Sequence, residues 1–163
     1  MSSPLLRRLR EEFDSSFERA IRRPRETVDI LCLSTAGQKF ALKIVEVKGF
    51  AKLDKLVPVP SHAEALAGIT GLRGEVLPVY DLARMLKLPS PASELRWIVT
   101  ISAQANTLAL GFEAIVGYDR VLKEIVGSQG RDLLVNGSVP WLGERVGLID
   151  LQAVVRKIME AEN

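Results

Sequence analysis

The hydrophobic positions of this chain follow two different periods, and the change between them divides the chain into two regions. Apolar residues near the N-terminus recur every three to four positions among Arg, Glu and Asp, at Leu5, Leu6, Leu9, Phe13, Phe17, Ala20 and Ile21. A period of about 3.6 residues predicts an amphipathic helix. Ser3 is a suitable N-cap, Pro4 suits the first helical position, and Pro24 predicts the end of the helix. We assign residues 1–26 to this element.

From Thr27 onward the apolar residues alternate with polar ones or form short runs bounded by Gly and Pro, a pattern typical of β-strands. The Ala36-Gly37 pair predicts a hairpin turn, and Pro78 should restrict its strand to a sheet edge or be the first residue of the strand. The predicted elements are the hairpin strands TVDILCLS and KFALKIVEV, a possible helical turn HAEALAGI, the strand EVLPVYDL and a C-terminal helix LQAVVRKIMEAE.

The same region repeats itself at an offset of 68 or 69 residues. The corresponding segments are Phe40-Ala41-Leu42 with Leu108-Ala109-Leu110, and GEVLPVYDLARML (from Gly74) with GERVGLIDLQAVV (from Gly143). Two copies of a unit of short strands indicate an architecture rather than a catalytic cassette. We predict a mainly β fold of two small antiparallel barrels, with a first half at about 27–90 and a second half at about 91–160.

The charged residues are unevenly placed. Of 22 basic and 20 acidic residues, seven and five lie in residues 1–26, which leaves 15 of each in the remainder. A body without net charge is a poor nucleic-acid surface, because such surfaces cluster Lys and Arg. The acids among the N-terminal arginines disfavour a membrane-surface helix. Two roles stay open for that helix: packing on the body, or docking on a partner.

Residues with catalytic or metal-binding chemistry are few and scattered. His62 is the only histidine, and the single cysteine, Cys32, lies in an apolar run where we expect it to be buried. Asp81 and Asp150 each lie where a strand gives way to a helical pattern, so we expect helix caps rather than an acid-base pair. The glycines of GITGLRG precede a strand and therefore do not form a phosphate-binding loop. We predict no enzymatic activity, no metal and no cofactor.

The chain shows no secretory pattern. Its N-terminus lacks the uninterrupted apolar stretch of a signal peptide, and no apolar run reaches the roughly 18 residues that a spanning helix needs. A lone cysteine suits a reducing compartment. We expect a cytoplasmic protein.

Positions where the two halves differ are candidates for function, because the fold does not require the difference. Arg73 lies in GLRG between apolar residues and glycines, whereas the matching residue of the second half is Leu142. An exposed loop arginine or a salt bridge across the barrel would explain Arg73 without a function. The functional interpretation is a hydrogen-bond donor placed for a partner, since a guanidinium offers five donors in a fixed fork.

These features together resemble the CheW-like family, the coupling proteins of bacterial chemosensory arrays. The resemblance runs from about Thr27 to Met159, and its strongest segment is LVPVPSHAEALAGITGLRGEVLPVYDLARMLKLP. There a PVP-like segment leads to an LRG motif and then to a strand ending in Asp-Leu, while GERVGLIDL matches the family's closing strand. The resemblance implies one CheW-like domain at 27–160, with two five-stranded SH3-like barrels that share a core.

The resemblance also implies a function and partners. Members of the family have no catalytic activity and join the cytoplasmic tip of chemoreceptors to the regulatory domain of a CheA-type histidine kinase, which controls motility. In the family, a groove between the two barrels binds the receptor's helical hairpin. We expect this protein to bind no nucleic acid and not to insert into the membrane. We expect a cytoplasmic protein associated with membrane-bound receptor arrays. The pathway could serve chemotaxis, or pilus or gliding motility.

Residue by residue, the LRG motif falls on Leu72, Arg73 and Gly74, and Arg73 is the strongest candidate for coupling. Apolar strand positions near the receptor groove or the kinase contact fall on the residues numbered 44 and 47. The partner-binding residues implied in this way are Ile44, Val47, Gly71, Leu72, Arg73 and Gly74.

Two departures from the family pattern favour an alternative function. Gly71 stands where the family usually has Asn, and Gly49 stands where an ungapped alignment places a frequent Glu. The alternative is a degenerate structural array member that binds receptor or neighbouring couplers without activating a kinase. A third reading, an SH3-like peptide-binding module, is disfavoured because the nine aromatic residues do not cluster in the sequence.

Overall fold

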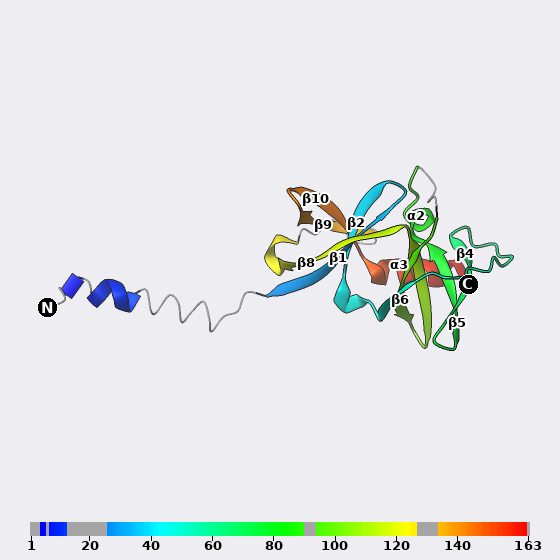
Figure 1. Cartoon of the computed structure of the whole chain (residues 1–163), viewed down its shortest axis with the longest axis horizontal. Helices are drawn as coiled ribbons and strands as arrows, with labels where there is room; N and C mark the ends of the chain where they lie inside the picture. The colour runs from blue at the N-terminus through cyan, green and yellow to red at the C-terminus, as the bar shows by residue number, and fades with distance from the viewer. Residues whose placement is uncertain (1–3, 6, 13–25, 90–93, 127–133, 163) are drawn as a thin grey trace.

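The computed structural model describes residues 4–5, 7–12, 26–89, 94–126 and 134–162. Residues 4–5 and 7–12 are helical, as the N-terminal period predicts, and the remainder of the predicted helix lies outside the described residues. Figure 1 shows this helical segment apart from the β-structure that makes up the body.

Among the described residues, ten strands form two five-stranded sheets, which we call sheet A and sheet B. Sheet A has the order β8-β1-β2-β10-β9, from Ala114–Leu122, Thr27–Thr35, Gln38–Lys43, Glu144–Ile149 and Val135–Trp141. Sheet B has the order β3-β6-β7-β5-β4, from Gly49–Lys52, Trp97–Ala103, Asn106–Phe112, Glu75–Asp81 and Leu66–Leu72. The mainly β fold class with two five-stranded units is therefore confirmed.

Each sheet takes strands from both halves of the sequence. β1 and β2 combine with β8, β9 and β10, whereas β6 and β7 combine with β3, β4 and β5. The seam inside each sheet is a parallel pair, with Leu148 of β10 beside Ala41 of β2, and Tyr80 of β5 beside Leu110 of β7. The predicted barrels are thus antiparallel except at this parallel pair, and the two halves also meet at the antiparallel pairs β1–β8 and β3–β6.

Apolar side chains form one shared core and two smaller cores. The shared cluster contains residues of both sheets and of the C-terminal helix, among them Leu33, Leu42, Val99, Phe112 and Val154. Sheet A encloses a second cluster that includes Cys32, and sheet B encloses a third around Val79, Ile98 and Ala109. Cys32 is fully buried, as its apolar neighbours predict.

Both Asp-Leu pairs cap helices, which confirms the expectation from their position. The Asp81 carboxylate accepts a 2.9 Å hydrogen bond from the Ala83 N–H at the start of α2 (Leu82–Met85). The Asp150 carboxylate accepts a 3.1 Å hydrogen bond from the Ala153 N–H in α3 (Leu151–Glu162). Each cap satisfies an N–H that has no partner within its helix.

Two local predictions are wrong. Pro78 lies in β5, which is an internal strand of sheet B, and it is tolerated because the ladder to β7 begins only at Val79. The segment HAEALAGI forms a turn at Glu64–Ala65 and then enters strand β4, so it is not a helical turn. Leu66 instead pairs with Tyr80, and Ile69 with Pro78, in the β4–β5 ladder.

Candidate partner-binding surfaces

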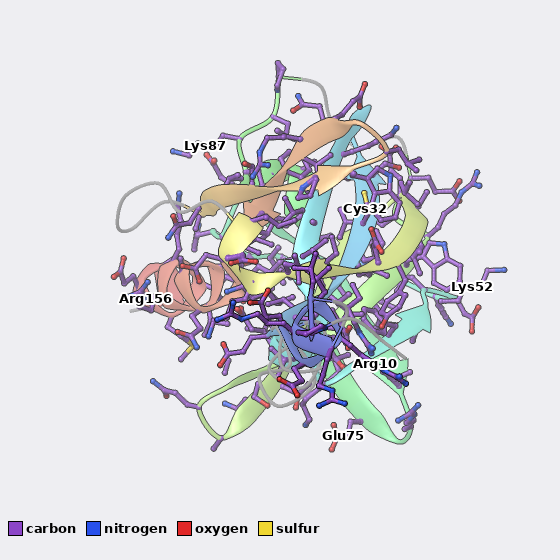
Figure 2. All side chains as sticks on the ribbon, turned by 90° about the vertical axis from the view of Figure 1, so that its left-hand side faces the viewer. Arg10, Cys32, Lys52, Glu75, Lys87 and Arg156 are labelled. Carbon is purple, nitrogen blue, oxygen red and sulfur yellow. The ribbon has the colours of Figure 1, made fainter. Side chains whose placement is uncertain are left out.

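Gly71, Leu72, Arg73 and Gly74 come together at the tip of the β4–β5 hairpin. Leu72 pairs with Glu75, so Arg73 and Gly74 are the two turn residues, with φ of 50° and 79°. Positive φ at both central positions defines the hairpin turn whose twist matches that of the strands. Figure 2 shows the labelled Glu75 at one end of the body, where this hairpin projects.

The Arg73 side chain is exposed at this tip, and it makes no hydrogen bond or ion pair with any residue that the structure describes. The reading of Arg73 as a salt bridge across the barrel is therefore wrong for this part of the chain. The same type of turn recurs at Ala36-Gly37 and at Leu142-Gly143. Because alanine and leucine occupy the same turn position elsewhere, the fold does not require an arginine there.

The glycines at positions 49 and 71 have no structural reason to be glycine. Of the glycines whose surroundings are described, these two alone have neither a positive φ nor a close contact at an added Cβ. A Cβ at Gly71 would meet only the Glu75 carbonyl at 4.0 Å, and one at Gly49 only the Thr100 hydroxyl at 3.5 Å. Both positions can therefore accept an added Cβ.

A groove of about 580 Å³ opens where the chain crosses from sheet A to sheet B. Its walls are the crossing turn η1 (Ile44–Glu46) with the two residues that follow, strand β6, and the first turns of α3. The lining residues are Val45, Glu46, Val47, Lys48, Ile101, Ser102, Leu151, Gln152 and Val155. The groove is therefore mainly apolar, with charged side chains at one wall.

The two apolar positions that sequence reasoning selected are not strand positions. β2 ends at Lys43, and Ile44 begins a 3₁₀ turn because the chain leaves sheet A here. Ile44 and Val47 are half-buried and pack on the shared core, whereas Val45 between them is 85% exposed. Sequence reasoning missed Val45, because it assumed the alternation of inward and outward side chains that holds only within a strand.

Glu46 places a partly buried carboxyl group in the wall of this groove. Its Oε2 is buried and has no hydrogen-bond partner among the described residues. Burial raises the pKa of the Glu46 carboxyl above its usual value, and the nearby Asp150 adds to this, while Lys43 and the Leu151 N–H act in the opposite direction. A cation brought to this wall would therefore relieve an existing cost.

The hairpin tip and the groove lie on either side of the β6–β7 hairpin. Lys48, next to Val47 in the groove, donates a 2.8 Å hydrogen bond to the Thr107 hydroxyl of β7. On its other side, Thr107 lines a cleft of about 490 Å³ together with Glu75 and the 70% exposed Val76 of β5. The β6–β7 hairpin thus separates the two candidate regions.

A family model described as the CheW-like domain matches residues 29–159, which is most of the chain. The chain belongs to the CheW-like family. Among curated proteins, it is 38% identical to the chemotaxis protein CheW of Bacillus subtilis (strain 168) over 53 residues, which is 32% of this chain and 34% of that protein. The alignment therefore spans about a third of that relative's length.

The CheW-like fold is also found among solved structures. The scaffolding protein TtCheW from Thermoanaerobacter tengcongensis superposes with a TM-score of 0.67 at 20% sequence identity, over 77% of this chain and 86% of that chain. At this identity the match shows the fold alone. In the part of the CheW-like chain that the structure describes, no three His, Cys, Asp or Glu residues cluster as metal ligands. No described helix is long and apolar enough to cross a membrane.

Proposed function

We propose that this CheW-like protein is a non-enzymatic adaptor of a bacterial chemosensory pathway, which couples chemoreceptors to a CheA-type histidine kinase. The observation that carries the proposal is Arg73: an exposed guanidinium without a described partner, at a turn position where the fold accepts Ala or Leu. An arginine of this kind is the side chain most suited to anchor a protein interface. The adaptor would act in the cytoplasm, at membrane-bound receptor arrays that control motility.

The groove supports a second contact surface. Its apolar lining and the 85% exposed Val45 suit the apolar face of a helix, as a receptor's helical hairpin would present. Ile44 and Val47 would act here by holding the η1 turn on the shared core, and Val45 would make the contact. Leu72 and Gly74 would hold the hairpin tip, and Gly71 would line its approach.

The experiment is affinity purification of the tagged protein from its native cells, with the retained proteins identified and quantified by mass spectrometry. We compare the wild type with Arg73→Ala and with the control Gln104→Ala, an exposed turn residue of sheet B that also has positive φ (56°). Ala36 shows that alanine is accepted in the Arg73 turn, so the Arg73 variant should fold.

We expect the wild type and Gln104→Ala to retain a CheA-type kinase and a chemoreceptor. Arg73→Ala should lose one of them by about 30-fold, the change that removal of an interface hot spot typically produces. Recovery of neither partner by the wild type would overturn the adaptor.

The degenerate structural array member is the second candidate. It is favoured by Gly49 and Gly71, because the fold does not require glycine at these positions and the family usually has other residues there. It predicts that the wild type retains receptors or neighbouring couplers but no kinase, and that Arg73→Ala changes nothing. The same purification therefore separates the two candidates.

A further inference from the structure

The N-terminal helical segment carries a short stripe of exposed apolar side chains. Leu5 and Leu9 are 66% and 54% exposed, and residues four apart lie on the same face of a helix. Arg8 and Glu12 lie on that same stripe, three and seven positions after Leu5. The stripe therefore combines two leucines with one cation and one anion, and its order along the helix is Leu5, Arg8, Leu9 and Glu12.

The groove beside η1 has the complementary composition. Val45 is 85% exposed at its mouth, and Val47 and Val155 continue the apolar wall. Glu46 supplies a carboxylate with an unpaired buried oxygen, and the exposed Lys48 supplies an ammonium two residues further. An amphipathic helix that entered here would meet apolar contacts flanked by both signs of charge.

The N-terminal segment also enters the body beside this groove. Ile30 of β1 pairs with Lys43, the last residue of β2, and η1 begins at the next residue and contacts β1. Thr27, the first residue of β1, lies three residues before Ile30, which is about 10 Å along the strand. Residues 13–26 separate Glu12 from Thr27, and 14 residues reach about 20 Å even at the 1.5 Å rise per residue of a helix. That distance exceeds the radius of gyration of a body of this size, about 14 Å.

We propose that the helical segment of residues 4–5 and 7–12 docks into this groove of its own chain. Leu5 and Leu9 then cover the valines of the groove, including the exposed Val45 at its mouth. The connection within one chain makes the docking intramolecular, so that a raised effective concentration favours even a weak contact. The favoured occupant is therefore the segment of the same chain.

Charge sets the direction of the docked helix. Arg8 meets the carboxylate of Glu46, whose Oε2 has no hydrogen-bond partner among the described residues, and Glu12 meets Lys48. The reverse direction would place like charges together, which costs about as much as the matched pairs contribute. If the groove takes a partner's helix, as the adaptor function requires, the docked segment competes with that partner. This last step rests on the proposed function, whereas the docking itself does not.

Hydrogen exchange of the purified full chain, followed by mass spectrometry, tests the docking without any partner. We compare the wild type with the double variant Leu5→Asp, Leu9→Asp. The amides of residues 45–48 and 151–155 should exchange at least about threefold faster in the variant, because the docked helix covers them. The matched control Arg7→Ala, Arg10→Ala makes the same change of two charge units away from the stripe and should exchange like the wild type.

Equal exchange in the wild type and the leucine variant would overturn the proposal. So would protection that appears only as protein concentration rises, since that result assigns the groove to a second copy. In the charge test, Glu12→Lys and Lys48→Glu should each speed exchange at residues 45–48, and the combined variant should restore it. Failure of the combined variant to restore exchange would overturn the stated direction. A negative exchange result leaves the purification experiment untouched, so failure of either proposal can be recognised separately.

Discussion

Sheets A and B are built from equivalent strands, but their interiors are filled very differently. The cluster inside sheet A has eight buried residues, including Trp141 at the end of β9, whereas the cluster inside sheet B has three. The position equivalent to Trp141 is Leu72, which is only partly buried. The adjacent turn residues are Leu142 in sheet A and Arg73 in sheet B.

A pair of glycines shows the same contrast. A Cβ at Gly117 of β8 would come within 2.8 Å of the Trp141 ring, while the equivalent Gly49 of β3 faces only the Thr100 hydroxyl at 3.5 Å. The two halves of the repeat have the same strands and turns, but they differ in how tightly these strands are packed. Sheet A is the better packed, and the hairpin of sheet B, which contributes less to packing, carries the exposed arginine.

The largest expected difference is between truncation of Trp141 and truncation of Leu72. Trp141 is 8% exposed, so Trp141→Ala should lower the free energy of unfolding by about 3–5 kcal/mol. Leu72→Ala should cost about 1–2 kcal/mol, because less apolar area leaves water there. Urea denaturation of both variants measures the difference, and equal losses would contradict the division between the sheets.

A smaller difference is expected between the two glycines. Gly117→Ala should destabilise by about 1–3 kcal/mol, because the Trp141 ring must move from its position. Gly49→Ala should lie within about 0.5 kcal/mol of the wild type, since its Cβ enters open space. Thermal unfolding followed by circular dichroism is sufficient, and a destabilised Gly49 variant would show an unexpected constraint at the candidate site.

The smallest effect concerns the crossings between the sheets. The first crossing holds Glu46, and the equivalent position of the second half is Ala114. Because burial raises the folded-state pKa of Glu46, the folded protein binds more protons than the unfolded chain between the two pKa values, and its stability falls as pH rises through that range. Above the raised pKa the cost is constant.

Glu46→Gln removes this cost and should raise the urea midpoint at pH 7, with a difference that shrinks as pH falls toward about 4.3, the ordinary pKa of Glu. The measurement is best made in the Leu5→Asp, Leu9→Asp chain, where Arg8 does not offset the cost. A lower midpoint at pH 7 would show that the carboxylate is stabilising instead.

Local patterns in the sequence predicted most of the elements correctly. The Ala36-Gly37 hairpin, the two Asp caps and the burial of Cys32 each depend on neighbours in the sequence, and each is confirmed. Arg73 became a candidate because the duplication supplied its own comparison. The structure then places Arg73 in the two-residue turn at the tip of the β4–β5 hairpin.

Features that depend on distant contacts could not be predicted in this way. The edge position expected of Pro78 was wrong, because the parallel partner β7 comes from the other half of the chain. Val45 was missed because nothing local announces that β2 ends at Lys43 and that the chain turns toward sheet B. The unpaired Oε2 of Glu46 is a property of packing and has no sequence signal.

The exchange of strands between the halves has a consequence for synthesis of the chain. β2 acquires its neighbour β10 only after residue 144 has been made, and β9 reaches sheet A only through β10. At about 5–20 residues per second, the roughly 100 residues between β2 and β10 take about 5–20 seconds to synthesise. During that interval the nascent chain presents the open edge of β2, beside Phe40 and Leu42, to its neighbours on the polysome. Sheet A is thus completed only when β10 has been synthesised, and the rate of translation sets how long the edge of β2 is open to aggregation.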